Sequence, residues 1–216
     1  MTQHAGPERS EPAGVPRPSR VRAIVAAALG VAATGVALGG LWAWIAPPIH
    51  AVVAITRAGE RVHDYLGPES QHFFDAPGLL LGLLTVLAVV GSVLVWQWRE
   101  HRGPAMVVGV SLGMVAAAAI AAATGALLVG LSYGAVNFDA VPLSGKPSVA
   151  YVSQAPPVFF GRLPLQVALT LMWPAGVAAL VYALLAAADA RDDLGGRPVA
   201  DRRPHAPPVQ PEAAVS

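Results

Sequence analysis

The sequence of 216 residues contains no cysteine and few charged side chains. The lack of cysteine excludes disulfides, thiolate zinc sites, iron–sulfur clusters and cysteine nucleophiles. Charged residues make up 12% of the chain, whereas an ordinary soluble domain has about 25%. A formal net charge of +1 offers no basic surface for phosphate groups, so we expect no nucleic-acid partner. These absences argue against a soluble enzyme and favour a membrane protein, with the lipid bilayer as its surroundings.

In place of charge, the chain has four long uncharged stretches. They lie between Arg22 and His50, Asp75 and Arg99, Arg102 and Asp139, and Arg162 and Asp189. A helix needs about 20 apolar residues to cross a bilayer, and continuous Ala, Val, Leu and Gly without strict alternation favour helices over barrel strands. We therefore predict an all-α membrane protein, a bundle of four transmembrane helices with spans near 23–46, 77–98, 105–131 and 165–187.

Local signals mark the starts of three spans. Prolines stand at or near the first turn of the second, third and fourth helices, at Pro77, Pro104 and Pro164. Proline is tolerated there because the first N–H groups of a helix have no helical partner. Asp75 is placed to cap the second helix. The first span is longer than a signal peptide's apolar region, so we expect it to remain uncleaved.

The basic residues predict the orientation. Ten arginines lie in the N-terminal tail, the second connection and the C-terminal tail: Arg9, Arg17, Arg20, Arg22, Arg99, Arg102, Arg191, Arg197, Arg202 and Arg203. The two longer connections hold four basic residues: Arg57, Arg61, Lys146 and Arg162. The positive-inside rule therefore predicts a multi-pass plasma-membrane protein with both termini in the cytoplasm. Trp42 and Trp44, at the outer end of the first span, are expected to act as interface anchors.

Outside the bilayer, the chain divides into tails and loops. Residues 1–21 and 191–216 are rich in Pro, Ala, Gly and charge, so we predict disordered cytoplasmic tails around a membrane domain at 22–190. The outer loops, 47–76 and 132–164, are long enough to be folded or functional. We predict that together they form a small extracytoplasmic β-sheet: a hairpin that turns at Gly59, and a third strand within 147–153.

The first outer loop gathers the polar side chains that could carry chemistry. They are His50, His63, Asp64, Glu69, His72 and Asp75. The three histidines and Asp75 are candidate metal ligands, and the whole set could supply general acids and bases. Their spacing matches no motif such as HExxH, so a solvated loop is the competing interpretation. No span contains an ionisable side chain, which argues against an ion-coupled transporter, and no cofactor is expected.

Small residues recur every fourth position on two of the predicted helices. They are Gly35 and Gly39 in the first helix, and Gly109, Gly113, Ala117, Ala121 and Gly125 in the third. Such stripes let two membrane helices approach closely. Gly109 to Gly113 also matches the hydrolase pattern G-x-S-x-G, but the pattern lies inside an apolar helix with no base nearby. We interpret the stripes as packing surfaces, whose partner is a helix of this chain or of a second protein.

The order of several short segments resembles one known family. Trp42–Pro47 ends the first helix, Phe73–Asp75 precedes a glycine-rich second helix, and Arg102–Pro104 opens the third; Pro164–Gln166 and Tyr182–Ala187 bound the fourth. Over about residues 22–190 this order is similar to that of the DUF2567 family of actinobacterial membrane proteins. The resemblance implies a plasma-membrane protein of a mycobacterium or relative. It implies no activity and no catalytic residues.

Three functions are consistent with these features. The first is a non-enzymatic accessory or scaffold protein that binds another membrane or envelope protein. The second is a component of a small-solute or lipid transporter, with a cavity at Pro174 and the glycines of the third helix. The third is a metal-binding or enzymatic site on the first outer loop. The absence of a catalytic spacing and of ionisable groups in the spans favours the first.

Overall fold

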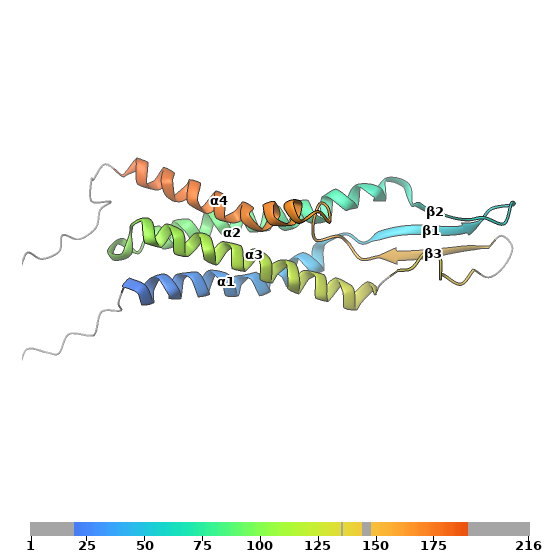
Figure 1. Ribbon diagram of the computed structural model, residues 1–216, viewed down its shortest axis with the longest axis horizontal. Coiled ribbons are helices and arrows are strands. Elements are labelled where there is room, and N and C mark those ends of the chain that lie inside the picture. Colours follow the sequence, from blue (N-terminus) through green and yellow to red (C-terminus); the bar gives the residue numbers. More distant parts are fainter. Residues whose placement is uncertain (1–19, 135, 144–147, 190–216) are drawn as a thin grey trace, which may run out of the picture.

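The computed structural model describes residues 20–134, 136–143 and 148–189. Four long helices dominate it: α1 (Arg20–Ile45), α2 (His72–Trp96), α3 (Pro104–Tyr133) and α4 (Pro164–Ala188). Single 3-10 segments, η1 (Gly67–Gln71) and η2 (Arg99–His101), precede α2 and α3. The four helices lie side by side along the long axis of the molecule (Figure 1). Each is long and apolar enough to cross a membrane, as the uncharged stretches predict.

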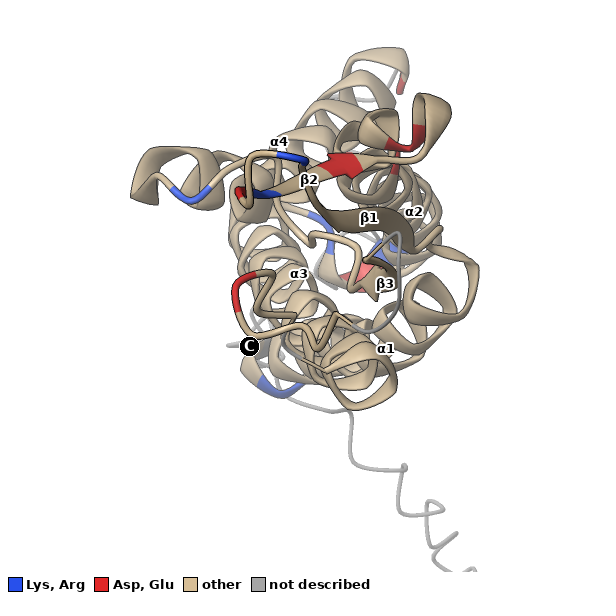
Figure 2. Ribbon diagram, turned by 90° about the vertical axis from the view of Figure 1, so that its right-hand side faces the viewer, with Lys and Arg blue, Asp and Glu red and all other residues tan. Residues whose placement is uncertain are grey.

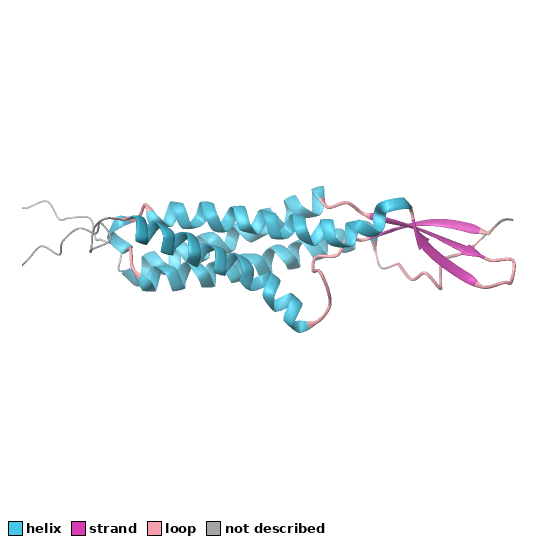
Figure 3. Ribbon diagram, turned by 90° about the horizontal axis from the view of Figure 1, so that it is seen from above, coloured by secondary structure: helices cyan, strands magenta, loops and turns pink. Residues whose placement is uncertain are grey.

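A small antiparallel sheet stands beyond one end of the bundle (Figures 1 and 3). Its strands are β1 (Ile49–Ile55), β2 (Arg61–Tyr65) and β3 (Val149–Gln154), in the order β2-β1-β3. Gly59, with a φ of 84°, forms the turn between β1 and β2. The predicted hairpin and third strand are therefore confirmed, and the fold is mostly helical with a three-stranded sheet.

The predicted start of the second helix was wrong. The helix begins at His72, so Asp75 lies in its first turn and Pro77 lies inside it. The N-cap residue is Gln71, because η1 runs directly into α2 and the backbone is already turning before the predicted boundary. Pro104 and Pro164, in contrast, stand in the first turns of α3 and α4, as expected.

The bundle has two buried clusters, one in each half. The cluster nearer the sheet is built around Trp42, which is fully buried and donates its indole N–H to the carbonyl oxygen of Ala76 at 2.7 Å. The other half is filled by Met106, Met114 and Tyr182. The prediction that Trp42 anchors in the membrane interface was therefore wrong, whereas Trp44 is 83% exposed.

The start of α1 and the end of α4 lie at the same end of the bundle, as expected for an even number of spans, and the sheet lies at the other end (Figure 1). Charged residues lie mainly on the loops and near the ends of the elements (Figure 2). The predicted disordered tails fall almost wholly outside the described residues, although α1 already includes Arg20 and Val21.

Candidate functional site

The polar residues of the first outer loop meet as one pair rather than as a cluster. His50 of β1 lies against Glu69 of η1, with 2.8 Å between the ring Nδ1 and a carboxylate oxygen. The same oxygen accepts the backbone N–H of His50. His72 makes a different contact, with its ring Nδ1 2.9 Å from the carbonyl oxygen of Pro48. Within the described residues, no group of three or more His, Asp or Glu side chains is arranged to hold a metal ion.

The strand register explains why His63 does not join the pair. His63 is paired with Val53, and His50 lies three residues before Val53 on the same strand. Because successive side chains of a strand point to opposite faces, His50 and His63 point to opposite faces of the sheet. The His63 ring stacks on Phe138, with 4.6 Å between ring centroids.

The pair of His50 and Glu69 ties the sheet to the bundle. Glu69 precedes α2 and lies outside its apolar run. The hydrogen bond from the backbone N–H of His50 lowers the pKa of Glu69 below its usual value of 4.5, and the His50 side chain adds to this shift. The carboxylate therefore stays ionised at neutral pH and holds the start of β1 against the turn that leads into α2.

The small-residue stripes of α1 and α3 pack against each other. A Cβ on Gly39 would lie 2.5 Å from the carbonyl oxygen of Ala121, and a Cβ on Gly35 would overlap the backbone of Ala117. From the other side, a Cβ on Gly113 would lie 2.9 Å from the backbone of Ala28.

The remaining two glycines of the α3 stripe are closed by side chains of α1. A Cβ on Gly109 would meet the side chain of Ile24, and one on Gly125 would lie 2.6 Å from the Trp42 ring. The stripe is thus used within the chain, so a partner protein would need another surface. Atoms of α1 occupy the space beside these glycines, and Pro174, the other residue of the expected cavity, is buried.

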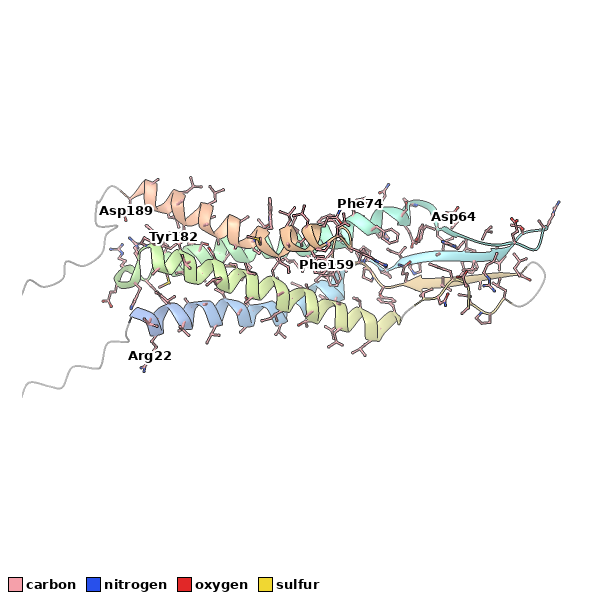
Figure 4. The ribbon with its side chains drawn as sticks, viewed as in Figure 1. Arg22, Asp64, Phe74, Phe159, Tyr182 and Asp189 are labelled. Atoms are coloured by element: carbon pink, nitrogen blue, oxygen red, sulfur yellow. The ribbon has the colours of Figure 1, made fainter. Side chains whose placement is uncertain are left out.

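A charged pair holds the opposite end of the bundle together. Arg102, just before α3, contacts Asp189 at the end of α4 at 3.0 Å, and the two side chains are 8% and 15% exposed. The guanidinium also donates to the carbonyl oxygen of Trp96 and lies 4.1 Å from the centre of its ring. The Trp96 ring meets the edge of Tyr182. Figure 4 shows Tyr182 and Asp189 at this end, far from Asp64 at the sheet. The contacts among Arg102, Asp189, Trp96 and Tyr182 indicate a structural role for these residues.

A groove on α2 escaped the sequence analysis. It has a volume of about 610 Å³, and we call it the α2 groove. It is lined by Gly78 and Gly82, with Asp75 and Phe74 at the end nearer the sheet and Val86 at the other end. The spacing of Gly78 and Gly82, four residues apart in an apolar helix, is the sequence signal that could have located it.

Strand β3 forms one edge of the sheet. In the register of β1 and β3, Ala150 and Val152 lie opposite Val53 and Ala51. Ser148, two residues before Ala150, accepts a hydrogen bond from Ile55, so these alternate residues of β3 bond to β1. The backbone groups of Val149, Tyr151 and Ser153 therefore point away from the sheet. Within the described residues, β3 pairs with β1 alone, and Tyr151 is 75% exposed.

Comparison with known proteins gives a family and relatives. The family model described as "Protein of unknown function (DUF2567)" matches residues 31–196. An uncharacterised protein of Mycobacterium tuberculosis H37Rv is 74% identical over 174 residues, which cover 80% of this chain and 90% of that protein. An uncharacterised protein of Mycobacterium leprae is 65% identical over 197 residues, covering 91% and 98%. No solved structure matches the chain.

Proposed function

Because the chain belongs to the DUF2567 family, whose name carries no activity, we propose its function from its geometry: a non-enzymatic accessory or scaffold protein of a cell-envelope complex. In this proposal the four helices anchor the protein in the plasma membrane, and both termini face the cytoplasm. The excess of arginine in the two tails and in the connection between α2 and α3 supports this orientation. The sheet then stands outside the membrane, where it can meet an envelope partner.

The observation that carries the proposal is the free edge of β3. An edge strand presents a row of unpaired N–H and C=O groups to which an extended chain can add. Natural edge strands are often blocked by Lys, Pro or a bulge, whereas Val149–Gln154 contains no charge and no proline. The edge is held in place by β1, whose Ile49, Ala51 and Val53 are fully buried. A rigid, uncharged and exposed edge suits the binding of a peptide segment.

A photo-crosslinking experiment in whole cells tests the proposal. A photoreactive phenylalanine at Tyr151, on the free edge, is expected to give one dominant adduct with an envelope protein. The matched control carries the same group at Arg57, in the exposed turn between β1 and β2, and is expected to give no such adduct. Mass spectrometry of the adduct identifies the partner and the crosslinked segment. Equal labelling from both positions, or no protein adduct from Tyr151, would refute the role of the β3 edge.

The α2 groove favours a second candidate function, the handling of lipid. An apolar trough in the wall of a membrane bundle is open to the bilayer, and its volume lies within the range of about 300–1,000 Å³ that is common for ligand pockets. For the third hypothesis, an enzymatic or metal site on the first outer loop, the described residues contain no group of three or more His, Asp or Glu side chains that could hold a metal, and His63 faces the other side of the sheet from His50.

A further inference from the structure

We propose that the α2 groove binds a single lipid of the outer leaflet, with its acyl chain over Gly78 and Gly82 and a cationic headgroup amine against Asp75. The inference requires the helices to lie in a membrane with the sheet outside. It does not require the accessory role or the edge of β3. The chemical class of the ligand is an amphipathic molecule with one long chain in the groove and an ammonium group.

The length of the groove along α2 matches the thickness of one leaflet. It runs along α2 from Asp75 to Val86, and at 1.5 Å per residue these eleven steps measure roughly 16 Å. The hydrocarbon core of a bilayer is about 30 Å thick, so one leaflet contributes about 15 Å. Asp75 is the last charged residue before the uncharged run of α2 and therefore marks the outer membrane boundary. A partner helix would cross both leaflets, whereas a lipid chain fills one.

The floor of the groove is kept open by glycine. A Cβ added to Gly78 or Gly82 would meet nothing within 4 Å, so packing inside the chain does not require glycine at either position. In contrast, the glycines at Gly39 and Gly113 are closed by a facing helix. Leu79 on one side, and Ile45 from the end of α1, form the walls. The result is an apolar trough of about 610 Å³.

The headgroup preference follows from charge. Asp75 is exposed at the outer end of the trough, and no ion pair or hydrogen bond is formed by its side chain within the described part of the chain. An ammonium group can form a charge-assisted hydrogen bond with this carboxylate, whereas an anionic headgroup would be repelled. A second copy of the chain, docked here about a twofold axis, would bring its own Asp75 to the same place. Like charges therefore disfavour self-association at the groove.

The test uses the full-length protein in bilayer nanodiscs. Two photoreactive lipids with the same diazirine-bearing acyl chains are compared, phosphatidylethanolamine and phosphatidylglycerol, and labelled peptides are located by mass spectrometry. The expected result is labelling of α2 between residues 75 and 86, with about tenfold preference for phosphatidylethanolamine, because a hydrogen bond to a charged group corresponds to roughly that ratio.

Three variants separate the contributions of shape and charge. Gly82→Leu fills the trough and is expected to reduce labelling by both lipids at least fivefold. Asp75→Asn is expected to remove the headgroup preference while leaving chain labelling, and Asp75→Glu is expected to keep it. Gly30→Leu is the matched control, because Gly30 is also open but lies on α1 outside the groove.

Four outcomes would overturn the proposal: equal labelling by the two lipids, full labelling in folded Gly82→Leu, labelling spread evenly over the four helices, or an α2 to α2 crosslink between two copies. Retained helicity of each variant, measured by circular dichroism, shows that it has folded. Because the crosslink from Tyr151 is measured separately, failure of the lipid proposal can be distinguished from failure of the accessory role.

Discussion

The contact of α1 with α3 offers the sharpest test of the fold. We consider Gly113→Ala, which adds one methyl group where the backbones of the two helices are in close contact. The new Cβ would lie 2.9 Å from both the Cα and the carbonyl oxygen of Ala28. Carbon atoms in ordinary contact are about 3.5–4.0 Å apart. Both of the contacted atoms belong to the backbone, so no side-chain rotation can relieve the overlap, and the helices must separate.

The expected cost follows from two opposing effects. Overpacking a close-packed site costs about 1–3 kcal/mol, and replacing glycine by alanine inside a helix returns about 1 kcal/mol through helix propensity. Gly30→Ala has the same gain without the overlap, since nothing lies within 4 Å of its added Cβ. The free energies of unfolding of the two variants should therefore differ by about 1–3 kcal/mol, with Gly113→Ala the less stable.

Titration of purified protein in mixed micelles with dodecyl sulfate, followed by circular dichroism, measures this difference. Both variants are compared with the wild-type protein under one set of conditions. If Gly113→Ala were as stable as Gly30→Ala within about 0.5 kcal/mol, the α1 to α3 packing described above would be refuted, because distant sites normally add within that margin.

Three further predictions concern the ends of the bundle. Asp189→Asn should destabilise the protein by about 3 kcal/mol in the same titration, because it leaves the largely buried Arg102 without its carboxylate partner; unchanged stability would contradict this assignment. The lowered pKa of Glu69 makes its stabilising effect present above pH 4.5 and lost as the pH falls through the lowered value. Hydrogen exchange at the start of β1 should therefore lose protection only in acid in the wild-type protein and at every pH in Glu69→Gln; a wild-type loss at neutral pH would argue against it. In a chain without native cysteine, a thiol at Ser70 should react with an impermeant reagent added to whole cells and one at Ser10 should not; the reverse pattern would invert the proposed topology.

The positions of the helices could be predicted because uncharged stretches of this length have one stable arrangement in lipid. The third span was predicted at 105–131, and α3 runs from Pro104 to Tyr133. The hairpin could also be predicted, since Gly59 lies between a Val- and Ile-containing segment and Arg61–Tyr65, and glycine readily adopts the positive φ found at this turn. In both cases the signal is local in sequence and independent of which neighbours the element meets.

The contacts between elements could not be predicted in the same way. Gly39 and Gly78 each belong to a pair of glycines four residues apart in an apolar helix. Helix α3 packs against Gly39, whereas nothing lies within 4 Å of a Cβ added to Gly78. Trp42 and Trp44 are two residues apart, and only the first faces the core. Which side of a helix is covered depends on the packing of distant segments, and a single sequence does not contain that information in its spacing.

The candidate polar site illustrates the same limit. His50 and Glu69 are far apart in sequence, and they meet because β2 runs antiparallel to β1 and brings η1 back to the start of β1. His63 is closer to Glu69 in sequence but points to the other face of the sheet. Sequence proximity therefore grouped residues that the strand register separates.

The direction of the strands limits how this protein can assemble with itself. The strands run along the same axis as the helices (Figure 1). Two copies that share a membrane are related by an axis perpendicular to the membrane plane, and such a twofold axis would make their β3 strands parallel, with identical residues at equal height. In a parallel ladder, a residue whose backbone N–H and C=O point towards the partner strand lies opposite a residue whose own groups point away from it. Such pairing needs an offset of one residue between the two strands, and the rotation does not provide it. A free β edge is an aggregation hazard in most proteins; in the membrane arrangement proposed above, a shared bilayer would keep that edge from pairing with a neighbouring copy and leave it available to the proposed partner.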